Sequence, residues 1–255
     1  MLKEGAFSNP VPEAIFGLHV WPNTLGSISL RPGALMASAA GLSIIVHGKQ
    51  THGAQPWRGV DPIVVASEIV VGLQSIVSRQ LDIRKGAAVI TIGSMNGGNR
   101  GNIIPDSVVM TGTVRTFVPG MEEDIAARIK STAQGIAQAS GATADVKVVG
   151  GYQPTINSAA LVAKMTPTLR RVDGPRLDVD MLPVTPSEDF SAFADKVPGM
   201  FFFLGVVPEG KDVATAAPNH SPFFFADEGA LPVGVRALSN LAVDFLASGG
   251  MRGGR

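Results

Sequence analysis

The sequence predicts an α/β protein into which an α+β domain is inserted. Residues 41–150 alternate strand-like and helix-like patterns in the order β-α-β-β-α-β. Residues 199–207, "GMFFFLGVV", are apolar at every position except two glycines, which is typical of a central strand covered on both faces. Residues 1–40 and 152–255 show a looser α/β pattern on either side of the insertion, so we expect them to form one domain together.

The first 40 residues contain two expected strands. Residues 14–20, "AIFGLHV", form a short β-type run that includes one histidine. Residues 24–33, "TLGSISLRPG", alternate apolar and polar positions and end in a Pro-Gly turn.

The inserted region has the most regular pattern. Its first helix is expected over residues 61–80, because Asp61 is a good N-cap, Pro62 suits the first turn, and apolar residues recur every three to four positions. Its second helix is expected over residues 121–140, with acidic residues in its first turn and Gly141 as its stop. The four expected strands are residues 42–49, 87–95, 107–117 and 144–152. This order predicts a ferredoxin-like sheet with both helices on one face.

The last third of the chain returns to an α/β pattern. We expect a partly helical segment over residues 157–172, and a short helix over 186–197 with Ser187 as its N-cap. The apolar strand 199–207 follows, then a loop "PNHSPFFF" and a final amphipathic helix over 227–248.

Composition excludes several classes of function. Lys plus Arg equals Asp plus Glu, 21 each, and no charged block typical of a nucleic-acid-binding arm occurs. The absence of cysteine excludes disulfides, thiolate metal sites and a thiol nucleophile. No continuous apolar run approaches the ~20 residues of a membrane helix, and the N-terminus lacks a signal-peptide core. We therefore expect a cytoplasmic protein without nucleic-acid or membrane partners, and the zero net charge favours association.

Two histidines are candidate metal ligands. His19 lies inside an apolar strand, where it is either a core histidine bonded to a backbone carbonyl or a metal ligand at the strand end. His220 follows a Pro-Asn turn and is either a solvated loop residue or a second ligand. Two histidines do not make a metal site, and no HxH or HExxH pair is present.

Three further residues are candidates for catalysis or substrate binding. His52, in "GKQTHGAQPWRGVDP", is a polar loop residue or a donor to a developing oxyanion. Asn102 follows a Gly-rich loop and either makes local turn bonds or binds substrate. Arg115 either recognises a carboxylate or faces solvent. No GxSxG nucleophile elbow and no phosphate-binding loop occurs in the sequence.

Six motifs, taken in order, resemble a known family. They are "IFGLHVWP", "GSISLRPG", "GKQTHGAQPWRGVDPIVVASEIVVGLQSIVSR", "GNIIPDSVVMTGTVRTF", "PSEDFSAFADKVPGMFFFLG" and "NHSP". Together they resemble the metal-dependent aminoacylase/carboxypeptidase family, and within it the branch of hippurate hydrolases and auxin–amino-acid-conjugate amidohydrolases.

This resemblance implies a fold and a reaction. It implies a doubly wound catalytic domain over residues 1–40 and 152–255 that binds divalent metal, zinc or manganese. It also implies a ferredoxin-like lid over residues 41–151 that makes a homodimer or a higher homo-oligomer. The implied reaction is hydrolysis of N-acyl amino acids and related small amides or esters. By resemblance, His19 and His220 match metal ligands, His52 matches the catalytic lid histidine that serves a neighbouring subunit, and Asn102 matches a lid residue at the substrate.

The sequence also departs from the family pattern. The branch has an upstream His-x-Cys-Gly-His-Asp-like motif and a Glu-Glu pair before the position of His19, and neither occurs here. We therefore expect the catalytic domain to be partial, without its N-terminal half, and metal occupancy to be low. Three readings follow: a hydrolase whose residual activity is greater on carboxylic esters, a non-catalytic dimerisation or binding module, and a metal-independent esterase that uses Ser187 or Ser221 near His220.

Overall fold

The computed structural model describes residues 1–173 and 176–252, and the chain divides into two compact units. Unit 1 comprises Met1–Met36, Thr155–Val184 and Glu188–Arg255. Unit 2 comprises Ala37–Pro154 and Thr185–Ser187. The second unit thus lies, in sequence, between segments of the first.

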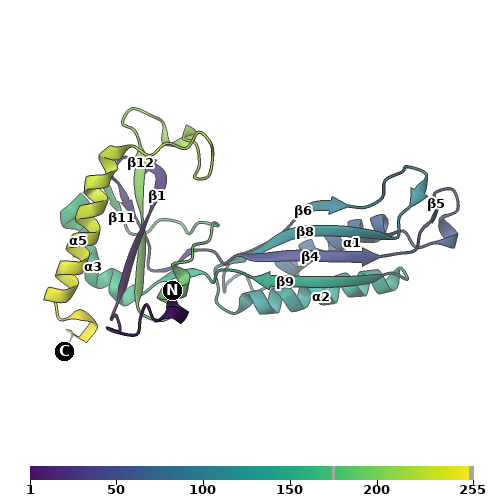
Figure 1. Ribbon diagram of the computed structural model, residues 1–255, viewed down its shortest axis with the longest axis horizontal. Helices are drawn as coiled ribbons and strands as arrows, with labels where there is room; N and C mark the ends of the chain where they lie inside the picture. The colour runs from purple at the N-terminus through teal and green to yellow at the C-terminus, as the bar shows by residue number, and fades with distance from the viewer. Residues whose placement is uncertain (174–175, 253–255) are drawn as a thin grey trace. The chain divides into compact units, whose positions relative to one another are not determined.

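Unit 2 is built on a four-stranded antiparallel sheet. Its strands are β4 (Ala40–His47), β6 (Ala88–Asn96), β8 (Ser107–Thr116) and β9 (Thr143–Gly150). They lie in the order β6-β8-β4-β9, and α1 (Pro62–Ser75) and α2 (Met121–Ala139) cover one face, as Figure 1 shows. With the element order β4-α1-β6-β8-α2-β9, this is the ferredoxin-like arrangement.

Residues at the ends of the two helices set where each helix begins or ends. The Asp61 side chain accepts hydrogen bonds from the backbone N–H groups of Ile63 and Val64, which confirms it as the N-cap of α1. A π-helical turn, Ile76–Gln80, extends α1. The chain leaves α2 through Gly141, whose φ of 72° is the left-handed conformation that favours glycine. The residues that these helices bury against the sheet include Val65, Ile69, Leu73, Ile125, Ile129 and Ala133.

Glu122, in the first turn of α2, gives a prediction about pH and stability. Burial raises the pKa of its carboxyl, and the neighbouring Glu123 raises that pKa further. Its Oε2 atom is buried without a hydrogen-bond partner in the described structure. A carboxyl whose folded-state pKa is raised stabilises the fold below its unfolded pKa, and this stability is lost as the pH rises through the folded pKa.

We therefore expect Glu122→Gln to raise the free energy of unfolding at neutral pH, by up to about 1 kcal/mol. The gain should vanish below the ordinary glutamate pKa of about 4.3, where both states are protonated. Urea unfolding of both proteins, at neutral pH and below the ordinary glutamate pKa, measures the difference in their free energies of unfolding. The exposed neighbour Glu123 is the matched control, and an equal gain in Glu123→Gln would contradict the assignment to burial.

Unit 1 has a mixed sheet with a fully buried strand. Its strands β1 (Ile15–Thr24), β12 (Gly199–Val207), β2 (Ile28–Ser29) and β11 (Leu177–Asp178) lie in the order β1-β12-β2-β11. β12 is buried at all nine positions and pairs in parallel with β1, as its apolar sequence predicts. Among the residues that the structure describes, β1 pairs only with β12 and so forms one edge of this sheet.

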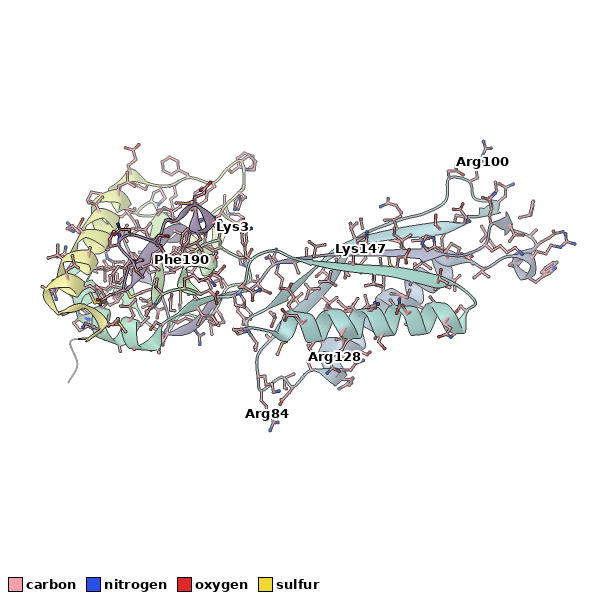
Figure 2. The ribbon with its side chains drawn as sticks, turned by 60° about the horizontal axis from the view of Figure 1, so that its bottom comes forward. Lys3, Arg84, Arg100, Arg128, Lys147 and Phe190 are labelled. Carbon is pink, nitrogen blue, oxygen red and sulfur yellow. The ribbon has the colours of Figure 1, made fainter. Side chains whose placement is uncertain are left out.

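Both faces of this sheet are covered. α3 (Ala159–Asp173) and α5 (Leu231–Ala247) pack on one face, where their apolar residues join Met200, Phe202 and Leu204 of β12. On the other face the ring of Phe190, which Figure 2 labels, has its centroid 4.9 Å from that of Phe201. Mixed α/β structure, as the sequence predicts, is therefore confirmed for this unit.

A buried asparagine joins a second, two-stranded sheet to β12. Strand β10 (Thr155–Asn157) pairs antiparallel with β3 (Gly33–Met36). Asn157 Nδ2 donates to the carbonyl oxygens of Arg31 and Phe201, at 2.9 Å each. Its Oδ1 accepts from the N–H of Phe201 at 2.7 Å. The asparagine side chain thus serves the β12 backbone as a neighbouring strand would.

One expected helix cap is wrong. The short helix α4 spans only Ser191–Ala194, and Ser187 does not cap it. Instead, Ser191 Oγ donates to the carbonyl oxygen of Glu188 at 2.9 Å, and Ser187 Oγ accepts from Arg115. The helix begins later than its sequence suggests because residues 189–190 form a turn before it, and the N–H of Asp189 donates to Glu188 Oε1.

Two helical segments of the described chain, Pro62–Gln80 and Glu228–Ala247, are long and apolar enough to cross a membrane by length and composition alone. Neither segment is a continuous apolar run, because polar residues such as Glu68 and Asn240 interrupt both, so the sequence analysis above does not predict them. Each buries one face in a core, through Ile69 in the first segment and Leu241 in the second. Core helices satisfy the same criterion, so we describe both as core helices.

Candidate functional site

His19 lies in the middle of β1, and its hydrogen bond fixes its tautomer. Its Nδ1 atom lies 2.6 Å from the carbonyl oxygen of Val20. A carbonyl oxygen only accepts, so Nδ1 carries the proton and the neutral ring leaves a lone pair on Nε2. Histidines that ligate metals usually donate their other ring N–H in this way. The same bond also satisfies a core histidine, so the two interpretations of His19 share this feature.

The loop that carries His220 is anchored at the same carbonyl. Asn219 Nδ2 donates to the Val20 oxygen at 3.0 Å, which brings this loop to β1. His220 has a φ of 68°, and it is the only non-glycine residue with positive φ in the part of the chain that the structure describes. Such a conformation is costly for a residue with a side chain and clusters at functional positions. The loop that carries His220 is therefore fixed to β1 at Val20, the residue after His19.

These two histidines do not complete a metal site by themselves. Within residues 1–173 and 176–252, no group of three or more His, Cys, Asp or Glu side chains is placed to hold a metal ion. Metal sites in proteins need at least three such ligands. The donor set of the described chain thus covers only part of a metal centre.

His52 and Asn102 lie together in unit 2. Strand β5 (Thr51–His52) pairs antiparallel with β7 (Ile103–Ile104), with His52 opposite Ile103. The N–H of Gly53 donates to the carbonyl oxygen of Asn102 at 2.8 Å. His52 and Asn102, about fifty positions apart in sequence, therefore lie side by side at the pair of strands that includes β5, which Figure 1 labels. Arg100, in the loop before β7, extends outward from the ribbon in Figure 2.

The tautomer of His52 is opposite to that of His19. The backbone N–H of Ala54 donates to His52 Nδ1 at 3.0 Å, so Nδ1 is the acceptor in the neutral ring. The proton of the neutral ring therefore sits on Nε2, which is free to donate to a carbonyl oxygen. This is the arrangement that a donor to a developing oxyanion requires.

Arg115 lies apart from the other two candidate residues of unit 2. Arg115 is the next-to-last residue of β8, whereas β7 directly precedes the start of that strand. Its Nη1 donates to the Ser38 carbonyl at 3.4 Å and to Ser187 Oγ at 3.2 Å. In this structure the guanidinium is bonded to its own unit, and the β5–β7 pair does not include it.

The serines considered as nucleophiles have other partners in the described chain. Ser187 Oγ accepts from Arg115, and Ser221 Oγ accepts from the N–H of Phe223 at 3.2 Å. Neither hydroxyl is bonded to a histidine base within the described residues, so a serine mechanism gains no support from the geometry.

Sequence reasoning missed Asn219. Its side chain fixes the His220 loop to β1, although the two residues it joins, Asn219 and Val20, lie 199 positions apart in sequence. The only available signal was the Pro218-Asn219 turn, and asparagine in a turn more often bonds its own backbone.

Comparison with protein families decides the relationship. The family model described as peptidase family M20/M25/M40 matches residues 1–244. The chain belongs to this family. The resemblance to metal-dependent aminoacylases and carboxypeptidases that the six motifs indicate is therefore confirmed at the level of the M20 family.

Relatives within the M20 family include hydrolases of amide bonds. The chain is 34% identical over 256 residues to "IAA-amino acid hydrolase ILR1-like 2" of Arabidopsis thaliana, covering 99% of this chain and 57% of the relative. It is 33% identical over 242 residues to an N-acetyldiaminopimelate deacetylase of Streptococcus suis, covering 94% of this chain and 62% of the relative. The chain thus spans about three fifths of the length of these relatives.

A solved structure of the M20 family shows the same fold. The Bacillus subtilis YXEP protein, described as a dinuclear metal-binding peptidase of the M20 family, superposes with a TM-score of 0.75 at 29% identity. The match covers 97% of this chain and 60% of that protein. The mixed α/β fold of this chain is therefore that of M20 peptidase structures.

Proposed function

We propose that this chain takes part in the hydrolysis of small amides of the N-acyl amino acid type. The observation that carries the proposal is the β5–β7 pair, which places His52 beside Asn102 and leaves His52 Nε2–H free to donate. Amide hydrolysis passes through a tetrahedral intermediate whose oxygen becomes negative, and a fixed N–H donor stabilises that charge. Membership of the M20 family and the amide-hydrolysing relatives support the same reaction class.

Each candidate residue receives a role in this proposal. His52 polarises the scissile carbonyl of substrate bound to a neighbouring subunit, and Asn102 contacts the substrate. Arg115 is the weakest candidate for substrate binding, since its guanidinium bonds Ser38 and Ser187.

A divalent metal ion, zinc or manganese, is part of the proposal. The M20 relative of Bacillus subtilis that is described as dinuclear metal-binding supports it. His19, through Nε2, and His220 would supply two of its ligands. Because the described residues hold no group of three or more ligands, we assign no step of the reaction to that metal.

A direct assay tests the proposal. Hydrolysis of an N-acetyl amino acid and of a p-nitrophenyl ester is followed with added zinc or manganese and with chelator, and metal content is read on the same preparation. We expect turnover of both substrates, greater on the ester because esters are easier to cleave, and loss of turnover with chelator. Clean protein that binds metal but cleaves neither substrate would contradict the proposal.

The incomplete ligand set favours a second candidate function, a non-catalytic module that only associates or binds. It predicts self-association without turnover in the same assay. Measurable hydrolysis by clean protein would exclude it.

We also expect a homodimer or a higher oligomer. In the described part of the chain, the sheet of unit 2 ends in the edge strands β6 and β9, and open edges are templates for pairing between chains. Light scattering at micromolar concentration should give at least twice the chain mass of 26.4 kDa. A monomeric mass at that concentration would contradict this expectation.

A further inference from the structure

The glycine-rich loop between β6 and β7 forms one wall of a polar cavity in unit 2. The cavity has a volume of about 630 Å³, and the loop lines it from Asn96 to Arg100. Gly98 has a φ of 75°, a left-handed conformation that favours glycine. A Cβ atom on Gly97 would lie 2.6 Å from Cγ2 of Val108, so the missing side chain lets the loop pack against the start of β8. The backbone of this wall is therefore held in place by the sheet.

The cavity opens on the face of the sheet that the helices leave uncovered. Val108 is 1% exposed and belongs to the core beneath α1 and α2, whereas its neighbour Val109 is 39% exposed and lines the cavity. Successive side chains of a strand point to opposite faces of the sheet. A ligand can therefore enter the cavity without any change in the hydrophobic core.

The same cavity borders the face of the β5–β7 pair that carries His52. Ile103 lines the cavity, and His52 lies directly opposite Ile103 in the antiparallel register. Directly opposed residues of such a pair point to the same face, with Cβ atoms about 5 Å apart. A ligand that accepts a hydrogen bond from His52 Nε2 can therefore extend into the cavity.

A turn joins Arg100 to the same site. The N–H of Ile103 donates to the carbonyl oxygen of Arg100 at 3.3 Å, which closes a turn with Gly101 and Asn102 at its centre. Arg100 is exposed and extends from the ribbon at this loop, as Figure 2 shows. Within the described residues its guanidinium forms no ion pair. Its N–H donors are therefore available to a carboxylate, which a guanidinium binds through two parallel hydrogen bonds.

Asp106 adds a negative charge to the lining of the cavity. The N–H of Gly48 donates to the Asp106 carbonyl oxygen at 2.8 Å, which ties this residue to the end of β4. Ser107 Oγ donates to Asp106 Oδ1 at 2.9 Å, and this bond leaves Oδ2 for a ligand. The described structure contains no ion pair between Asp106 and Arg100, although both line one cavity. Two opposite charges that do not pair with each other suit a ligand that carries both charges.

The rest of the polar lining is neutral. It includes the carboxamide side chains of Gln50, Asn96 and Asn99, which both donate and accept hydrogen bonds. A phosphate group fits this lining less well, because Asp106 would repel its second negative charge. An amino-acid group, with one ammonium and one carboxylate, matches the lining in both charge and hydrogen bonding.

We propose that this cavity binds an amino-acid group at the far end of the acyl chain of the substrate. Arg100 binds the carboxylate of that group, and Asp106 binds its ammonium. The carbonyl that His52 polarises belongs to the acyl half of the amide, so the acyl chain is the part that continues into the cavity. A γ-glutamyl amide is the simplest substrate of this kind, because a short methylene chain joins its amide carbonyl to the carbon that carries both charges. This inference rests on the proposed amide hydrolysis and specifies the acyl group.

The test compares N-acyl glycines that differ only at the far end of the acyl chain. γ-Glutamylglycine carries both charges, N-glutarylglycine only the carboxylate, N-(4-aminobutanoyl)glycine only the ammonium, and N-butanoylglycine neither. With added zinc or manganese, kcat/KM is measured for each substrate on the unchanged chain and on Arg100→Gln and Asp106→Asn. Arg84→Gln is the control, because Arg84 is an exposed arginine of the same unit that pairs with Asp82 and does not line the cavity.

We expect kcat/KM to be about tenfold higher for γ-glutamylglycine than for N-butanoylglycine, both in the unchanged chain and in Arg84→Gln. Arg100→Gln should abolish the advantage that the carboxylate gives, and Asp106→Asn the advantage that the ammonium gives, each mainly through KM. Hydrolysis of all four substrates without preference, or a preference that survives both substitutions, would overturn the inference and leave the proposed function in place.

A binding measurement keeps the inference separate from failure of the proposed function. Saturation-transfer NMR detects γ-glutamylglycine bound to each form of the chain whether or not turnover occurs, with N-butanoylglycine as the reference ligand. If no N-acyl glycine is cleaved, the proposed function fails and binding decides the inference. A γ-glutamylglycine signal that Arg100→Gln loses and Arg84→Gln keeps would support the cavity as the binding site. An equal signal in all forms, or no signal in the unchanged chain, would overturn it.

Discussion

Replacing His52 with alanine should lower kcat for an N-acyl amino acid by about 10²- to 10³-fold, the usual effect of removing one oxyanion donor. Ala54 N–H holds Nδ1 of the ring as an acceptor, so Nε2–H is the group that the substitution removes. The side chain is exposed and lies at the end of a strand, so the fold should be retained. Steady-state kinetics on the preparation that shows turnover, with circular dichroism as the check on folding, measures the effect.

His47 provides the matched control for this experiment. It lies in the same unit, is exposed, and its Nε2 is 2.9 Å from Asp145 Oδ2 on the neighbouring strand. His47→Ala should leave kcat within about twofold of the unchanged protein, because exposed pairs of this kind contribute little. Equal losses in both variants would indicate a general effect on unit 2. An unchanged rate in His52→Ala would show that this histidine is not the donor.

Replacing Asn157 with alanine should lower the free energy of unfolding of unit 1 by about 3 kcal/mol. The side chain is 1% exposed and makes three hydrogen bonds to the backbone of Arg31 and Phe201. Alanine would leave these backbone groups buried without those partners. Each unsatisfied buried group costs about 1–3 kcal/mol, although relaxation of the site reduces the sum.

The two tryptophans allow this unfolding to be followed in one unit. Trp21 packs 4.4 Å from the ring of Phe203 in unit 1, whereas Trp57 in unit 2 is already 76% exposed. The change in tryptophan fluorescence during urea unfolding therefore reports mainly on unit 1. Asn240→Ala is the control, because that exposed side chain bonds only Arg236 of its own helix, and it should change stability by less than about 0.5 kcal/mol. If Asn157→Ala also lowered the free energy of unfolding by less than about 0.5 kcal/mol, the strand-like role of Asn157 would be contradicted.

Some features of the candidate site could be predicted from the sequence, and others could not. His19, His52, Asn102 and His220 could be selected from the sequence through their motifs. Their protonation could not, because the tautomer of each ring depends on a hydrogen-bond partner that only the folded backbone supplies. Arg115 bonds Ser38 and Ser187, which lie 77 and 72 positions from it in sequence, and no local pattern indicates these bonds.

The sequence by itself determined the elements whose signals are local. Asp61 and Pro62 start α1, Gly141 ends α2, and the apolar run 199–207 forms the buried strand β12, because caps, turns and apolar periodicity act over a few residues. Only the tertiary structure decided that β1, whose sequence is also mostly apolar, lies at the edge of its sheet. It also decided that Asn219 joins the His220 loop to β1 across 199 positions. Pairing of a strand and closure of a long loop depend on distant parts of the chain, so neither leaves a mark in the adjacent sequence.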